Sequence, residues 1–157
     1  MSGVKSALSV LLLCFLLVSC NEEKTVKAEK PVEAEKTIQE RAEAGDADAQ
    51  YNMGMMYDNG DEVPQDKDEA MKWMRKAAEK GNAKAQNNLG GRYYNGDGVP
   101  QDKAKASMFF NLAAAKGHEN GKDNSEQIKK RMTKEQIAEG QKLTREWVER
   151  KAKENGQ

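Results

Sequence analysis

Residues 82–117 read NAKAQNNLGGRYYNGDGVPQDKAKASMFFNLAAAKG, and residues 46–81 read DADAQYNMGMMYDNGDEVPQDKDEAMKWMRKAAEKG. The two stretches align without a gap, and 19 of their 36 positions are identical. A fixed period of this length indicates stacked units of secondary structure, because one unit alone cannot bury its apolar face. The sequence therefore predicts a repeat architecture with two complete units.

The first half of each unit predicts a helix, called helix A. Small or apolar residues recur every four positions and so share one helical face; they are Ala49, Met53 and Tyr57, then Ala85, Leu89 and Tyr93. Asp46 and Asn82 stand at the expected N-caps. Gly60 and Gly96 stand where a left-handed residue would end each helix.

The second half predicts another helix, called helix B. Val-Pro-Gln-Asp forms the turn, and its aspartate caps a helix that Gly81 or Gly117 ends. Asp66 and Glu69 have capping-box spacing, whereas Lys105 replaces the acid in the second unit, whose helix should start more weakly. The apolar positions are Ala70, Trp73, Met74, Ala77 and Ala78, then Ala106, Phe109, Phe110, Ala113 and Ala114.

These units resemble the Sel-one-like repeat, a relative of the tetratricopeptide repeat. The matching motifs are Ala-x-Ala-Gln, Leu-Gly-x-x-Tyr, Asn-Gly-Asp-Gly-Val-Pro-Gln-Asp and Ala-Ala-x-x-Gly, nearly all of them within residues 82–117. The first unit departs at Met53 and at Glu62, which replaces a loop glycine and is expected to change that loop's conformation. The motif positions that the resemblance makes structural are Gly54, Tyr57 and Asp66, then Gly90, Tyr93 and Asp102.

Shorter helical stretches flank the repeats. Residues 34–45 align with the end of helix B, and residues 120–153 are expected to form a capping helical hairpin with a fraying charged tail. Its first helix should bury Gly121, Ser125, Ile128 and Met132, and its second should present Ile137, Gly140, Thr144, Trp147 and Val148. The fold class is thus all-α, a short α-solenoid of antiparallel helix pairs over residues 34–153.

The first nineteen residues predict a signal peptide. Lys5 supplies a positive charge, and the uncharged, leucine-rich stretch of residues 7–18 is short for a membrane span. The segment ends in Leu-Val-Ser-Cys, which resembles the lipobox of bacterial lipoproteins. The resemblance predicts a signal peptide over residues 1–19 and acylation of Cys20, with palmitate among its chains. An ordinary signal peptide or an N-terminal membrane anchor is the alternative.

Residues 20–33 predict a lipidated cysteine and a flexible tether. The stretch after the cysteine reads NEEKTVKAEKPVE and holds almost nothing to bury. Acyl chains contribute about 0.8 kcal/mol per buried methylene, so they would hold the protein on a membrane of the bacterial cell envelope. Asn21 follows the cysteine where a retention signal has aspartate, which in a Gram-negative cell favours the periplasmic face of the outer membrane.

Composition argues against several kinds of chemistry. Lysine plus arginine and aspartate plus glutamate number 26 each and are interspersed, which argues against a nucleic-acid partner. Both cysteines lie in the first twenty residues, and the single histidine, His118, fits a helix start. We expect no cofactor and no metal. The acidic first loop is interpreted as solvated, with a weak calcium site as the alternative; its acids are Asp58, Asp61, Glu62 and Asp66.

The remaining face of helix A suggests a function. By resemblance to tetratricopeptide stacks, this face would bind a peptide or a partner domain, and a plain solvated face is the alternative. Exposed tyrosine and methionine are suited to such contacts. The candidate partner-binding residues are Asp48, Tyr51, Met55, Asp58, Lys84, Asn87 and Tyr94, with Gly91 beside them.

We therefore expect a binding module, not an enzyme: a lipid-anchored adaptor, scaffold or inhibitor of another protein, whose identity the sequence does not give. The alternative is an envelope hydrolase, related to cysteine-rich members of the repeat family that are linked to penicillin binding or β-lactam hydrolysis. Residues 21–157 contain no cysteine and no Ser-x-x-Lys, which argues against that alternative.

Overall fold

The computed structural model describes residues 37–156. The predicted signal peptide, Cys20, the tether and the first residues of the predicted repeat domain lie outside the described residues. Every regular element in the described part is a helix, which confirms the all-α class: α2 (Ile38–Glu43), α3 (Ala47–Asn59), α4 (Lys67–Glu79), α5 (Ala83–Asn95), α6 (Lys103–Ala115), α7 (Glu119–Lys129) and α8 (Lys134–Asn155). None of these helices combines the length and apolar character needed to cross a membrane.

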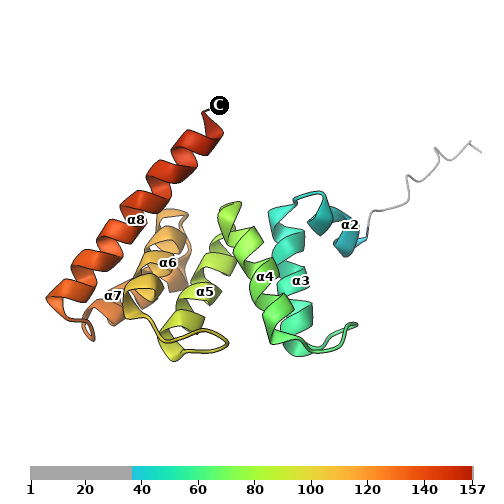
Figure 1. The fold of residues 1–157 in the computed structure, drawn as a ribbon, viewed down its shortest axis with the longest axis horizontal. Helices are drawn as coiled ribbons and strands as arrows, with labels where there is room; N and C mark the ends of the chain where they lie inside the picture. The colour runs from blue at the N-terminus through green and yellow to red at the C-terminus, as the bar shows by residue number, and fades with distance from the viewer. Residues whose placement is uncertain (1–36, 157) are drawn as a thin grey trace, which may run out of the picture. The chain divides into compact units, whose positions relative to one another are not determined.

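Helices α3 and α4 form the first predicted repeat, and α5 and α6 form the second (Figure 1). The predicted caps of helix A are confirmed. The Asp46 carboxylate accepts backbone N–H groups of the first turn of α3, and the Asn82 side chain accepts the N–H of Ala85 in α5. Gly60 and Gly96 end these helices with φ of 81° and 82°. The solenoid therefore repeats its local backbone geometry as well as its sequence.

The start of helix B differs from the prediction in one respect. Asp66 caps α4 by accepting two backbone N–H groups, but the reciprocal bond of a capping box is absent. The backbone N–H of Asp66 instead donates to the carbonyl of Tyr57 at 2.9 Å, and the Glu69 carboxylate pairs with Lys72. Because the Asp66 N–H already donates to Tyr57, the Glu69 carboxylate forms an ion pair with Lys72 instead of a capping-box bond.

The loop before α4 also corrects an expectation. Glu62 does not change the loop conformation; it adopts a left-handed backbone with φ of 61°, close to the 69° of Gly98 in the second repeat. The two loops therefore share one shape. A residue with a Cβ atom is disfavoured at such φ values, so the first loop carries the strain.

The main core lies where α4, α5 and α6 meet. Met74 and Leu89 are its largest fully buried side chains. Tyr93 of α5 stacks on the buried ring of Phe109 of α6, with ring centroids 5.6 Å apart. Gly90 makes room for the neighbouring Phe110, which packs with Ile128 of α7, because a Cβ atom at position 90 would lie 2.6 Å from the Phe110 ring.

At the N-terminal end, α2 continues the repeat outward. The side-chain N–H of Gln50 donates to the carbonyl of Ala42 at 3.0 Å, and Gln86 makes the same bond to Ala78 at 3.1 Å. These pairs lie 36 residues apart, so α2 occupies the place of a helix B end, as the alignment of residues 34–45 predicted. Gly45 ends it with φ of 93°.

At the C-terminal end, α7 is helix A of a third, incomplete unit. His118 caps it, with Nδ1 accepting the N–H of Gly121 at 3.1 Å. This N-cap lies 36 residues after Asn82, just as Asn82 lies 36 residues after Asp46. Three of the four residues predicted for its apolar side, Gly121, Ser125 and Ile128, are buried as expected. Met132 is not on this helix, which ends at Lys129, and it is only partly buried beside Ile128.

The predicted capping hairpin is wrong in its packing, because α7 and α8 both lie chiefly against α6 rather than against each other. Thr133 opens α8 with the predicted capping box, and Gly140 is buried against α6. Trp147 meets Phe109 edge-on, with ring centroids 5.6 Å apart. Val148, which the sequence predicts on the apolar face of this helix, is 53% exposed. Leu143, which was not predicted there, packs on the main core.

The charged C-terminal tail, which the sequence predicts to fray, is helical as far as Asn155. Helix α8 runs on to Asn155, and both Arg150 and Lys151 pair with Glu79 of α4. Partial burial works to raise the pKa of Glu79, but hydrogen bonds from the two cations outweigh it and hold that pKa below its ordinary value. Helix α8 is thus fastened to the first repeat as well as to the second.

Candidate functional site

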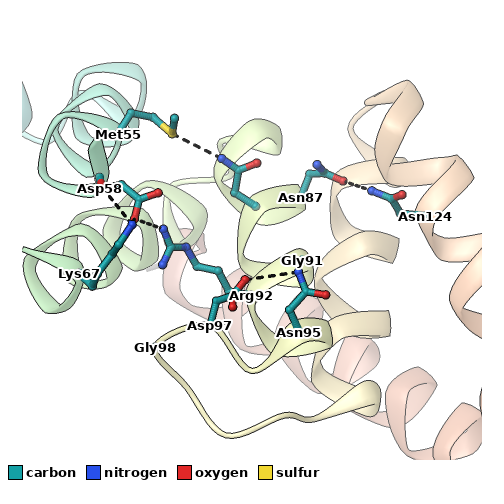
Figure 2. Close-up of a pocket in the computed structure, with 11 residues that line it drawn as sticks. Met55, Asp58, Lys67, Asn87, Gly91, Arg92, Asn95, Asp97, Gly98 and Asn124 are labelled. Carbon is teal, nitrogen blue, oxygen red and sulfur yellow. Dashed lines mark hydrogen bonds and ion pairs between the residues drawn. The ribbon is translucent and has the colours of Figure 1, made fainter. Parts of the chain in front are cut away.

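An open groove of about 630 Å³ lies along the A helices, with walls from α3, α5 and α7 (Figure 2). The start of α4 and the loop after α5 complete its edge. Among its lining side chains only Met55 is apolar; the others carry amides or charges, apart from two glycines. The groove is therefore a polar surface built from successive copies of the same helix.

One wall holds a charge cluster that links three helices. Arg92 of α5 forms an ion pair with Asp58 of α3, and Lys67 of α4 approaches the same carboxylate at 3.0 Å. The side chains of Arg92 and Asp58 are only 11% and 19% exposed. Partial burial works to raise the pKa of Asp58, but hydrogen bonds from the two cations hold it below its ordinary value. This carboxylate is already satisfied within the chain.

The floor and the opposite wall carry amide side chains. Asn124 of α7 donates its Nδ2 to Asn87 Oδ1 of α5 at 3.0 Å. Asn88 donates its Nδ2 to the Tyr51 hydroxyl at 3.3 Å and to the sulfur of Met55 at 3.6 Å. Within residues 37–156, no hydrogen-bond partner is found for Asn87 Nδ2, Asn88 Oδ1 or Asn124 Oδ1. The groove therefore presents both donors and acceptors.

Gly91 lies in the middle of α5 and lines the groove. A Cβ atom placed on it would meet nothing within 4 Å, whereas a Cβ atom on the preceding Gly90 would clash with an aromatic ring. Glycine inside a helix costs about 1 kcal/mol relative to alanine. No close contact within the described residues requires glycine at position 91. The loss of helix stability that Gly91 causes is therefore not offset by tighter packing.

The structure brings only some of the predicted binding residues together. Met55, Asp58 and Asn87 line the groove with Gly91. Half-buried Tyr51 is not in the lining; it packs on the main core and accepts a hydrogen bond from Asn88, which is in the lining. The others lie elsewhere. Asp48 accepts the amide of Asn82 at 2.7 Å and borders a separate depression with Lys84, and the Tyr94 hydroxyl accepts from Arg131 at 2.7 Å in another pocket.

Sequence reasoning missed Arg92 and most of the amides. A signal for two of them exists in the period itself, because asparagine recurs at positions 52, 88 and 124. Reading that signal requires treating α7 as a third helix A rather than as a cap. No comparable signal marks Arg92, whose counterpart in the first repeat is Met56.

The acidic loop residues do not form a metal site. Within residues 37–156, no three side chains among histidine, cysteine, aspartate and glutamate are grouped so that they could hold a metal ion. The carboxylate of Asp58 is turned to Arg92 and Lys67, and that of Asp66 to the first turn of α4.

These features define an α-solenoid of helix-pair repeats. The Sel1 repeat family model matches residues 47–82 and 83–118. A Sel1 repeat protein from Oxalobacter formigenes has a similar crystal structure, with 32% identity and a TM-score of 0.60 over 74% of this chain and 86% of that one. The chain belongs to the Sel1 repeat family.

A second similar structure is c5321, a protective antigen present in uropathogenic Escherichia coli strains that displays an SLR fold. The identity is 34% and the TM-score 0.68, over 74% of this chain and 25% of that one, so the present chain spans about a quarter of that protein. No curated protein matches the chain. Sel1 repeat proteins generally act as protein-interaction modules, and their fold is typically a non-catalytic scaffold.

Proposed function

We propose that this chain is a lipid-anchored protein of the bacterial cell envelope that binds a partner protein through the groove along α3, α5 and α7. The observation that carries the proposal is Gly91. Its missing side chain costs the fold stability, relieves no clash within the described residues and leaves the backbone of α5 open at the groove. Glycine is favoured where another molecule must approach a backbone closely.

The family supports the same function, since its members generally bind proteins. The proposal adds an anchor: Cys20, acylated after removal of residues 1–19, would hold the protein on a membrane, and the polar stretch up to residue 33 would act as the tether. An adaptor, a scaffold and an inhibitor would each use the groove in this way.

A single substitution tests the groove. Gly91→Leu should obstruct the middle of the groove without disturbing the fold, because a Cβ atom at this position of α5 meets no other part of the described chain within 4 Å. Ala138→Leu, at an exposed position of α8, adds a similar side chain outside the groove and serves as the control. A partner cross-linked to the wild-type protein in envelope extracts should be lost with Gly91→Leu and kept with Ala138→Leu. Equal recovery with both would contradict the groove assignment.

The anchor is tested separately. Cys20→Ser should abolish palmitate labelling and shift the protein to the aqueous phase in detergent partitioning, because a hydroxyl does not replace the thiol in lipoprotein maturation. Circular dichroism should stay helical, since the helices of residues 37–156 pack on one another. Palmitate incorporation by the serine variant would refute this acylation site.

A further inference from the structure

We propose that a cavity between the end of α4, the end of α6 and helix α8 binds an N-acylated apolar amino acid. Such a group occurs as a free small molecule and at the carboxyl end of a peptide chain. The cavity has a volume of about 250 Å³ and shares no lining residue with the groove along the A helices. It is therefore a second site, built from other residues, and it does not depend on the proposed function of the groove.

One wall of the cavity is apolar and belongs to α6 and α8. Leu112 is buried, Trp147 is half-buried, and Val148 is 53% exposed. Val148 is one of two large apolar side chains that are exposed within residues 37–156. An apolar side chain of a ligand would cover this wall and remove its apolar surface from water.

A buried amide oxygen without a partner belongs to the same lining. Gln86 of α5 is 2% exposed, and its Nε2 donates to the carbonyl of Ala78 at 3.1 Å. Its Oε1 accepts no hydrogen bond within the described residues. Gln50 has the same unpartnered oxygen 36 residues earlier, but it does not line this cavity. A buried acceptor is costly to leave unpaired, so the ligand that suits Gln86 carries an N–H donor.

The lining also carries an excess of positive charge. Three lysines and one glutamate contribute to it, and the glutamate, Glu79, is already paired with Arg150 and Lys151. Lys116 pairs with no carboxylate within residues 37–156. Its Nζ lies beside the cavity, because a Cβ atom placed on the lining residue Gly81 would be 3.8 Å from it. Lys116 is thus available to a ligand carboxylate.

The apolar wall, the free acceptor and the free cation match one chemical group. An N-acyl amino acid carries its side chain, its amide N–H and its carboxylate around a single Cα atom. A fatty acid offers the carboxylate and the apolar chain but has no donor for Gln86. The volume lies just below the range of about 300–1,000 Å³ of cavities that bind drug-sized ligands, so it suits one residue and the peptide group before it.

The two tryptophans of the chain provide the test. Trp147 lines the cavity, whereas Trp73 packs in the first repeat and serves as the internal control. The ¹⁵N-labelled full-length protein in detergent is titrated with N-acetyl-L-leucine and followed by NMR, with Trp147→Phe to assign the two indole N–H signals. The Trp147 signal should shift and saturate while the Trp73 signal stays in place. No shift at Trp147, or equal shifts of both signals, would overturn the inference.

Three changes to the ligand each remove one of the expected contacts. N-acetyl-L-leucinamide lacks the charge for Lys116, N-methylation of the amide removes the donor for Gln86, and N-acetylglycine lacks the apolar side chain. Each change should weaken binding at least about tenfold, the effect of one lost contact of this kind. Octanoate that binds as tightly as N-acetyl-L-leucine would refute the role of Gln86 and with it the inference.

A pentapeptide that ends in leucine distinguishes the two sources of this group. Binding at least as tight as that of N-acetyl-L-leucine would support the end of a peptide chain as the ligand. Binding of N-acetyl-L-leucine but not of the pentapeptide would support a free N-acyl amino acid.

Matched variants test the protein side. Lys116→Gln should weaken binding of N-acetyl-L-leucine about tenfold, whereas Lys129→Gln, at an exposed position of α7, should leave it unchanged. Ala115→Phe places a large ring at an exposed lining position and should block the cavity. Gly91→Leu, which obstructs the groove, should have no effect here, so failure of the groove and failure of this site are distinguishable. Unchanged binding by Lys116→Gln, or loss of binding with Gly91→Leu, would overturn the inference.

Discussion

Arg92 of α5 pairs with Asp58 of α3, and this contact ties the second repeat to the first at the edge of the groove. Both side chains are largely withdrawn from solvent, and Lys67 at the start of α4 joins the same carboxylate. The cluster therefore couples the relative position of the two repeats to the shape of the groove wall.

Asp58→Asn should destabilise the protein by about 1–2 kcal/mol, because it removes a partly buried ion pair and leaves Arg92 without its counter-charge. Urea unfolding at neutral pH measures the change. Asp123→Asn, at an exposed carboxylate of α7, is the control and should stay within about 0.5 kcal/mol of the wild type. Equal stability of the two variants would show that the pair adds nothing to folding.

Acid should destabilise the fold partly through Asp58 and Glu79. Their pKa values are lowered in the folded protein, so their contribution is fully present above the unfolded carboxyl pKa of about 4 and is lost as the pH falls through the lowered values. Urea unfolding measured from pH 7 down to about 3 should show this loss. The double variant Asp58→Asn, Glu79→Gln should have lower stability at pH 7 and a shallower decline below pH 4; an unchanged slope would contradict the assignment.

Two adjacent glycines should respond to alanine with opposite signs. Gly91→Ala should raise stability by about 1 kcal/mol, because the new methyl group enters open space and the helix propensity improves. Gly90→Ala should lower stability by about 1 kcal/mol, since overpacking against Phe110 outweighs that gain. Thermal and urea unfolding of both variants provide the measurement, and shifts of the same sign would disprove the packing at one of the two positions.

The equivalent loop residues Glu62 and Gly98 should also differ in sign. Gly98→Ala should cost about 1 kcal/mol, because it places a Cβ atom at φ of 69°. Glu62→Gly should stabilise the protein by roughly 0.5 kcal/mol. Glycine relieves the backbone strain of the folded loop, and this gain outweighs the extra conformational freedom that glycine gives the unfolded chain. Unfolding free energies at neutral pH check both. Loss of stability in Glu62→Gly would mean that the glutamate side chain contributes more than its backbone strain removes.

Local signals in the sequence predicted the repeats well. Helix caps such as Asp46 and Asn82, and the glycines that end helices, act within one turn, so neighbouring residues are enough to locate them. The failed capping box at Asp66 shows the limit of this reasoning. A capping box needs the Asp66 N–H to donate to the Glu69 side chain, but this N–H donates to the carbonyl of Tyr57, nine residues before Asp66. Sequence spacing alone does not reveal that competition.

The groove was harder to predict because it depends on contacts between units. Asn87 and Asn124 lie 37 residues apart, and Arg92 reaches Asp58 across a repeat boundary. The helical pattern shows which face of α5 is free, yet it does not show which free residues find partners on the next helix. Tyr94 lies one repeat after Asp58 but faces Arg131 in a pocket of its own.

The third N-cap, His118, shows that the solenoid continues with the same step after its second repeat. The bond from Gln50 to Ala42 recurs from Gln86 to Ala78, and the caps at Asp46, Asn82 and His118 keep the same step. Helix A of each unit therefore packs on the end of the preceding helix B with the same 36-residue step. Duplicating residues 82–117 in tandem would keep the 36-residue step and add another copy of α5 to the groove. At the new junction, α6 would meet the copied α5 in place of α7, and α8 would lose its pairs with Glu79 of α4.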